Sequence, residues 1–134
     1  MNNLKSAFDS LQETGGASYN FSTGILNPTS GWMVSITDHE QKYPIPKDYI
    51  EFGKLITDYL YKNFESVGTR LDILFNEPTL YLGLWINKDD NLLYVDISEC
   101  YEWFTEAVHF GMKYKQLAIY DCANKREFKI SYPA

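Results

Sequence analysis

The sequence has few of the residues that build metal or cofactor sites. Its 134 residues include two cysteines and two histidines, whereas a zinc site needs three or four ligands at a recognisable spacing. A small secreted domain normally carries a denser cysteine framework, so Cys100 and Cys122 are expected to be free thiols in a reducing compartment. No dinucleotide fingerprint, P-loop or Gly-x-Ser-x-Gly element is present. The sequence therefore predicts neither a metal nor a cofactor.

Basic residues and long hydrophobic runs are also scarce. Twelve Lys and Arg stand against eighteen Asp and Glu, which gives a formal net charge of -6. Lys125, Arg126 and Lys129 are the only local basic group, so direct nucleic-acid binding is disfavoured. No stretch approaches the length of a membrane span, and Lys5 and Asp9 interrupt the apolar run that a signal peptide needs. We expect no membrane association and a cytoplasmic location.

Aromatic residues are abundant: eleven Tyr, eight Phe and three Trp. Aromatic side chains fit pleated, half-buried surfaces, which favours a fold that contains a sheet. Tyr and Trp also suit interfaces, because a large apolar body carries a polar tip. Most of these rings are expected in the core, and the remainder on a surface that binds a partner.

Apolar residues at helical spacing predict three helices. They cover residues 4–11, 47–64 and 105–114. Gly15 is expected to follow the end of the first helix, and Thr105 to act as N-cap of the third. Residues 47–64 have the broadest apolar stripe and form the strongest of the three patterns.

Alternating or short apolar runs predict strands. These are residues 18–21, 32–37, 80–86, 92–97, 116–121 and 128–132. The pair that flanks residues 87–91 is a β-hairpin. Residues 38–46 are polar with two prolines and are expected to form a loop, and residues 71–75 are too short to be assigned as strand or helix.

Together these elements predict a single α+β domain over residues 1–134. We expect an antiparallel sheet of four to six strands with two or three helices packed on one face. The predicted core consists of Phe52, Leu55, Ile56, Tyr59, Leu60, Leu82, Leu84, Val95, Ile97, Val108, Leu117, Ile119 and Ile130.

One group of residues is compatible with catalysis. His39 lies between Asp38 and Glu40, and a carboxylate beside an imidazole can orient a general base. With Asp96 these residues could supply the acid and base of a small metal-independent hydrolytic enzyme. Neighbours along a loop seldom point in one direction, so a polar connection is the simpler interpretation. Cys100 is expected to be inert, because adjacent carboxylates would raise its pKa.

Acidic and aromatic residues concentrate in the second half of the chain. The acidic group consists of Asp96, Glu99, Glu102 and Glu106, with Asp89 and Asp90 at the hairpin. This group can be a solvated edge, a surface that meets a basic partner, or an active site, and we favour these interpretations in that order. Aromatic rings among carboxylates could stack on a partner and repel the wrong ones. The predicted binding surface consists of Tyr94, Asp96, Glu99, Tyr101, Glu102, Trp103, Glu106 and Tyr120.

Several segments between residues 15 and 121 share a further pattern. They are Gly15–Asn20, Thr29–Ser35, His39-Glu40, Tyr81–Trp85, Tyr94–Ser98 and Gln116–Asp121. This pattern resembles small uncharacterised proteins of bacteriophages and prophages, a group that supplies no catalytic residues to carry over. The resemblance implies a mobile-element origin and an accessory role, and by analogy the inhibition of a host defence system. The expected partner is a host protein, such as a nucleic-acid-binding defence protein, or a small ligand; self-association of the chain stays open.

Overall fold

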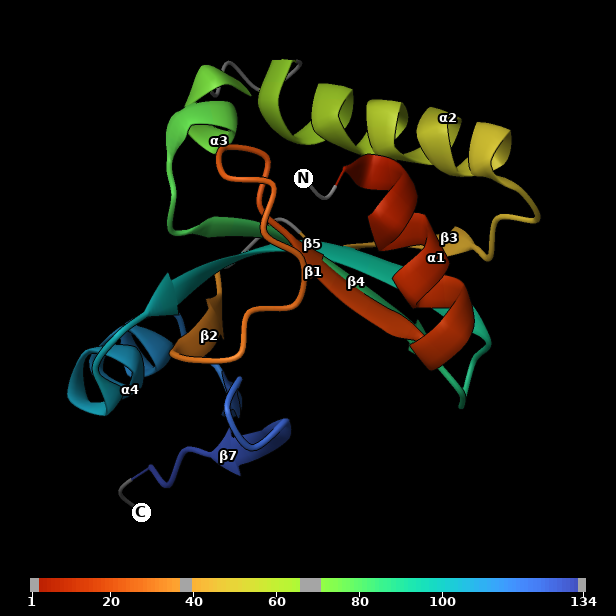
Figure 1. The fold of residues 1–134 in the computed structure, drawn as a ribbon. Coiled ribbons are helices and arrows are strands. Elements are labelled where there is room, and N and C mark those ends of the chain that lie inside the picture. Colours follow the sequence, from red (N-terminus) through yellow and green to blue (C-terminus); the bar gives the residue numbers. More distant parts are fainter. Residues whose placement is uncertain (1–2, 37–39, 66–70, 133–134) are drawn as a thin grey trace.

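The computed structural model describes residues 3–36, 40–65 and 71–132, which form one mixed α and β structure (Figure 1). The described residues contain seven strands in a single antiparallel sheet, ordered β1-β4-β5-β2-β6-β7, with β3 paired to β5. The elements are α1 (Leu4–Thr14), β1 (Gly16–Tyr19), β2 (Trp32–Ser35), β3 (Gln41–Pro44), α2 (Tyr49–Leu60), the π-helical turn η1 (Tyr61–Glu65), α3 (Leu71–Asn76), β4 (Leu80–Asn87), β5 (Leu92–Tyr101), α4 (Phe104–Lys113), β6 (Ala118–Asp121) and β7 (Arg126–Lys129). The predicted α+β class is confirmed, with one more strand and one more α-helix than the upper limits expected.

The two faces of the sheet follow from the register of β4 and β5. Leu84 lies opposite Val95, and Trp85 lies opposite Tyr94. Because side chains alternate along a strand, Leu84 and Val95 point to one face and Trp85 and Tyr94 to the other. The first face is covered by helices and is called here the inner face. We call the second, which presents Tyr94 and Asp96, the outer face.

The main core lies between the inner face and the first three helices. Phe52 and Tyr59 of α2 are fully buried against Leu82 and Val95, and Leu74 of α3 belongs to the same cluster. Helix α2 begins at a capped residue, because the Asp48 carboxylate accepts a hydrogen bond from the backbone N–H of Glu51 at 2.8 Å. Burial of its apolar stripe is the chief contribution of this helix to stability.

Helix α1 ends where the sequence predicts. The backbone of Gly15 has φ of 83°, and its N–H donates to the carbonyl of Leu11 at 2.9 Å. Glycine is favoured in this left-handed conformation because it has no Cβ. The turn lets the chain pass directly from α1 into β1.

Helix α4 covers the other end of the same face. Ala107 of α4 packs on Val34 of β2 and Ile119 of β6, and Val34 lies opposite Glu99, an inner-face position of β5. A Cβ on Gly111 would lie 2.7 Å from Cδ1 of Ile130, so glycine allows close packing here. All the described helices therefore pack on one face, as predicted.

Three local expectations are wrong. Residues 41–44 lie in a region expected to be a loop but pair with residues 92–95 as β3. A strand is possible there because Pro44 ends it, where the missing N–H leaves the rest of the ladder intact. Leu117 precedes β6 and is 80% exposed, so it is not a core residue. Trp103 rather than Thr105 is the N-cap of α4, without a side-chain capping bond.

The connection between β1 and β2 closes part of the outer face. Asn20, fully buried, donates through Nδ2 to the carbonyl of Pro78 at 2.7 Å, and the Cys100 sulfur donates to the carbonyl of Ser30 at 3.8 Å. Figure 1 shows this connection in orange, running from the end of β1 to β2. Tyr81 is buried beneath this end of the face, together with Met33, whereas Trp85 at the other end is exposed.

Within the described part of the chain, no helix combines the length and apolarity that crossing a bilayer requires.

Candidate functional site

An aromatic row crosses the open end of the outer face. Gly16, Trp85, Tyr94 and Lys42 follow one another on β1, β4, β5 and β3. The rings of Trp85 and Tyr94 meet edge to face, with centroids 5.2 Å apart and planes at 72°. Nζ of Lys42 lies 4.9 Å from the Tyr94 ring centroid, a cation–π distance. The Tyr94 hydroxyl also donates to the Asp90 carboxylate in the hairpin turn. The Tyr94 side chain is thus held by Lys42 and Asp90 in addition to its contact with Trp85.

Trp85 is the exposed member of this row. It leaves 53% of its surface in contact with solvent although its strand, β4, is paired on both sides. On β1 the neighbouring outer-face residues are Gly16 and Ser18, which are too small to cover the indole. Two small residues therefore lie beside the ring of Trp85, and this surface suits contact with a partner's planar or aliphatic group.

A carboxylate lies in the next row of the outer face. A Cβ on Gly83 would lie 2.3 Å from Oδ1 of Asp96, so the carboxylate occupies the space that a larger residue would fill. Oδ2 of Asp96 accepts a hydrogen bond from Oγ of Ser35 at 2.7 Å. Burial raises the pKa of Asp96, the Ser35 bond opposes this, and the charge of Glu40 adds to the rise. Asp96 is a positioned acceptor next to the aromatic row.

Two of the four residues considered for catalysis come together here. Glu40 interacts electrostatically with Asp96, whereas Asp38 and His39 lie outside the described residues. Among the residues that the structure describes, no three His, Cys, Asp or Glu gather closely enough to hold a metal ion. Of the four residues, the described part of the chain thus places two carboxylates, Glu40 and Asp96, close enough to interact electrostatically.

The residues predicted to bind a partner are divided between the two faces. Tyr94 and Asp96 lie on the outer face, as does Tyr120 on β6, opposite Met33 and 41% exposed. Glu99 and Tyr101, at odd-numbered positions of β5, lie on the inner face. They are separated from the aromatic row by the thickness of the sheet.

Glu99 and Tyr101 make contacts typical of a structural role. The Tyr101 hydroxyl donates to Oε1 of Glu99 at 2.7 Å, and the Tyr101 ring stacks on Phe110 of α4 at 5.0 Å. Oε2 of Glu99 accepts from the Thr79 hydroxyl at 2.9 Å. Burial, followed by the bond to Glu99, raises the pKa of Tyr101. These contacts fix α4 on the sheet.

The remaining predicted residues, Glu102, Trp103 and Glu106, surround the start of α4. Trp103 is 62% exposed. Nearby, Phe104 packs edge to face on Trp32 and on Phe128, at 4.9 and 5.0 Å between centroids. We call these three rings the terminal aromatic cluster. Sequence reasoning missed this cluster, because rings from β2, α4 and β7 meet only in the folded chain.

Trp85 was missed for a different reason. The sequence does show the alternation in which Leu84 and Trp85 point to opposite faces. What it does not show is which face the helices leave open. An exposed tryptophan on a central strand becomes visible only when all helices are known to pack on the inner face.

The two cysteines lie in one small cluster with Met33 and Tyr81. A hydrogen bond between the thiols lowers the pKa of Cys100 and raises that of Cys122. The expectation that neighbouring carboxylates would raise the pKa of Cys100 is therefore wrong, because the bond from the second thiol has the largest effect and outweighs burial.

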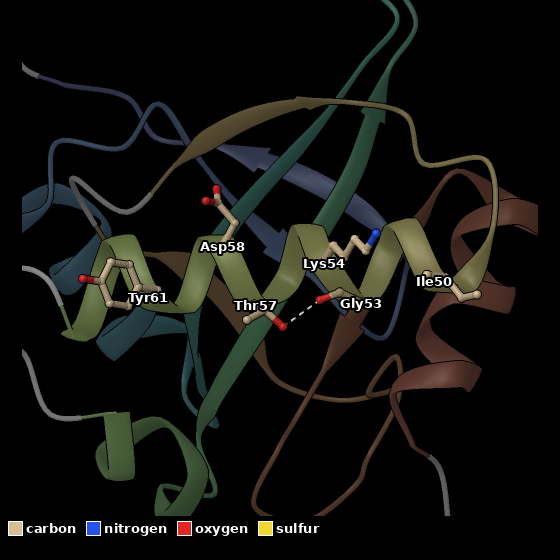
Figure 2. A pocket seen from close by; sticks show the side chains of 6 residues that line it. All are labelled: Ile50, Gly53, Lys54, Thr57, Asp58 and Tyr61. Atoms are coloured by element: carbon tan, nitrogen blue, oxygen red, sulfur yellow. Dashed lines mark hydrogen bonds between the residues drawn. The ribbon is translucent and has the colours of Figure 1, made fainter.

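One hollow in the described structure lies elsewhere, on the solvent side of α2. It measures about 680 Å³ and is lined by Ile50, Gly53, Lys54, Thr57, Asp58 and Tyr61. Figure 2 shows these side chains along one helix, with Thr57 bonded back to the carbonyl of Gly53. Since α2 and the first residue of η1, which continues it, supply the whole lining, the hollow is a shallow depression without converging polar groups.

Comparisons with protein-family models, with curated proteins and with solved structures find no match for this chain.

Proposed function

We propose that this chain is a non-enzymatic binding protein that recognises a partner protein through the open end of its outer face. One observation carries the proposal: Trp85, 53% exposed, stands edge to face on Tyr94 on a sheet face that the helices leave free. Tryptophan and tyrosine are the residues most often found to dominate binding energy at protein interfaces.

The aromatic row is pre-organised for such a contact. Tyr94 is held by its bond to Asp90 and by the Lys42 ammonium group over its ring. A side chain that is fixed before binding loses little conformational freedom on binding. The row therefore offers apolar contact area at a small entropic cost.

The charges around the row favour a basic partner. The chain carries a net charge of -6, and two carboxylates, Asp90 and Asp96, border the aromatic pair against one cation, Lys42. Complementary charges at the rim increase the association rate and are screened by salt. Raising the salt concentration should accordingly weaken the complex.

In biological terms, we place the protein among the accessory proteins of bacteriophages or mobile elements. The resemblance of segments within residues 15–121 supports this placement. The proposed role is inhibition of a host defence protein in the host cytoplasm by occupying its surface. Binding could also take a second form, in which a small ligand is sequestered beside Trp85, over Gly16 and Ser18.

A hydrolytic enzyme is the second candidate, and one observation favours it. Burial and, to a smaller extent, the charge of Glu40 raise the pKa of Asp96, which is how a carboxyl group is kept protonated to act as a general acid. This candidate predicts that Asp96→Asn abolishes activity while Trp85→Ala only weakens substrate binding.

The test compares immobilised wild-type protein with Trp85→Ala and Trp103→Ala in bacterial lysate. Trp103 is a matched control, because it is similarly exposed but lies at the start of α4. Mass spectrometry identifies captured proteins and small molecules. We expect a stoichiometric binder that is lost with Trp85→Ala and retained with Trp103→Ala. Loss with Trp103→Ala alone would transfer the site to α4, and no stoichiometric binder would contradict the proposal.

A further inference from the structure

Strand β7 forms an open edge of the sheet. It is the last strand in the sheet order, and all four of its residues are exposed. The N–H of Ile130 donates to the carbonyl of Leu117 at 2.9 Å, in the same register that places Phe128 opposite Ile119. Bonding alternates along an antiparallel strand. Phe128 therefore directs its N–H and C=O toward β6, whereas Glu127 and Lys129 direct theirs outward.

The other edges of the described sheet are protected, β1 by a paired segment and β3 in part by a proline. On β1, the Ser18 N–H donates to Oδ1 of Asn27 at 2.9 Å, and the Asn27 N–H donates to the Ser18 carbonyl at 2.8 Å. Leu26 forms a bridge to Tyr19 on the same side. Strand β3 ends at Pro44, which has no N–H to offer. Strand β7 has no comparable cover within the described residues, and unprotected edges are where strands from other chains add.

We propose that β7 pairs with β7 of a second copy of this chain, antiparallel and centred on Phe128. In this register the outward N–H and C=O groups of Glu127 meet those of Lys129 in the second copy, and the reciprocal pair forms by symmetry. Glu127 then faces Lys129 across the strands on the outer face, an arrangement that stabilises a pair of strands.

Backbone bonding and charge together disfavour the other registers of the β7 pair. A shift by one residue would place inward-directed groups opposite outward-directed ones, so the backbone ladder would not form. Of the registers that keep the ladder, one places Glu127 opposite Glu127 and another places Lys129 opposite Lys129. Like charges directly opposite destabilise a strand pair. The sequence Glu127-Phe128-Lys129 is complementary to itself in one register only.

The inner face of β7 adds apolar contact to this pairing. Phe128 is 43% exposed and Phe104 39% exposed, and both belong to the terminal aromatic cluster. Residues that face each other without hydrogen bonds have the closest side chains in an antiparallel pair. The symmetric register places Phe128 at such a position, next to Phe128 of the second copy. The two terminal aromatic clusters would then adjoin across the axis and cover surface that is exposed in one copy.

The test is the oligomeric state of the full chain, measured by sedimentation velocity over a wide concentration range. We expect a concentration-dependent dimer for the wild type. Glu127→Lys and Lys129→Glu should each raise the dissociation constant about tenfold or more, since two attractive pairs become repulsive. The double variant Glu127→Lys/Lys129→Glu should restore the dimer. Glu13→Lys, an equal charge change on exposed α1, is the control.

Three outcomes would overturn the proposal. A wild-type chain that stays monomeric up to its solubility limit would show that the edge does not self-associate. A dimer that both single variants leave intact would use another surface. Failure of the double variant to regain the dimer, while its thermal unfolding matches the wild type, would show that the two charges do not face each other. Because β7 lies outside the row around Trp85, capture of a partner protein by Trp85 is tested independently.

Discussion

Adjacent residues of β4 allow the two faces of the sheet to be tested with one pair of substitutions. Leu84 is 3% exposed on the inner face, and Trp85 is 53% exposed on the outer face. Replacing each by alanine removes a large apolar side chain from the same strand. The residues share their backbone environment, so the difference between the variants reports which face is packed.

The expected magnitudes differ severalfold. Leu84→Ala leaves a cavity between the sheet and α2 and should reduce the free energy of unfolding by about 3 to 4 kcal/mol. For a chain of this length that corresponds to a melting temperature about 10 °C lower. Trp85→Ala loses the edge-to-face contact with Tyr94 but leaves no enclosed cavity, because about half of the side chain is exposed, and should cost about 1 kcal/mol. Its melting temperature should fall by about 3 °C.

Thermal unfolding followed by circular dichroism measures both variants against the wild type. Chemical denaturation provides a check, because the slope of unfolding free energy against denaturant should stay unchanged. A larger loss for Trp85→Ala than for Leu84→Ala would refute the reasoning. A slip of one residue in the register reverses the faces of every side chain on β4, so that result would move Trp85 into the core and remove the proposed site.

Three further predictions concern single residues. Asp96→Asn should raise the free energy of unfolding at neutral pH, because burial raises the pKa of Asp96 and its charged form therefore destabilises the folded state. This gain in stability should vanish as the pH falls through the raised pKa to the ordinary value of 3.8. Equilibrium unfolding at several pH values measures both effects. Asn20→Ala should cost about 1 to 3 kcal/mol by chemical denaturation, since it removes a buried amide that donates to the carbonyl of Pro78 and accepts from the backbone N–H groups of Ser22 and Thr23. Asp48→Ala should cost about 1 kcal/mol in the same assay by removing the cap on the Glu51 N–H, and an effect below about 0.3 kcal/mol would contradict the capping role.

Long periodic segments are the part of the fold that the sequence predicts well. Helix α2 is expected over residues 47–64 and runs over Tyr49–Leu60, with η1 continuing to Glu65. The central hairpin is expected around residues 87–91 and is found there. In both elements, local periodicity and the packed face agree, so propensity and tertiary contact favour the same structure.

Elements that depend on distant partners are predicted poorly. Strand β3 has two prolines in its neighbourhood and forms because β5 is long enough to pair with it over residues 92–95. Leu117 has the correct parity for the inner face, yet it precedes β6 and lies outside the cluster that α4 forms with Ile119. Neither outcome can be read from local spacing.

The predicted binding surface is divided in the structure because β5 is longer than the sequence predicts. The sequence predicts a strand that ends at Ile97, so residues 99–106 are expected to form one surface with Asp96. In the structure β5 continues to Tyr101. Alternation then places Asp96 on the outer face and Glu99 with Tyr101 on the inner face. Extending the strand by four residues divides a surface that was expected to be continuous.

The central claim is that Trp85 anchors a partner protein on the outer face. Its most direct test is the dissociation constant of the captured partner, measured by titration calorimetry with wild type, Trp85→Ala and Trp103→Ala at equal ionic strength. An anchor residue contributes about 2 kcal/mol or more, so Trp85→Ala should weaken binding about 30-fold while Trp103→Ala changes it less than about threefold. Equal affinity for wild type and Trp85→Ala, with both proteins folded, would contradict the claim.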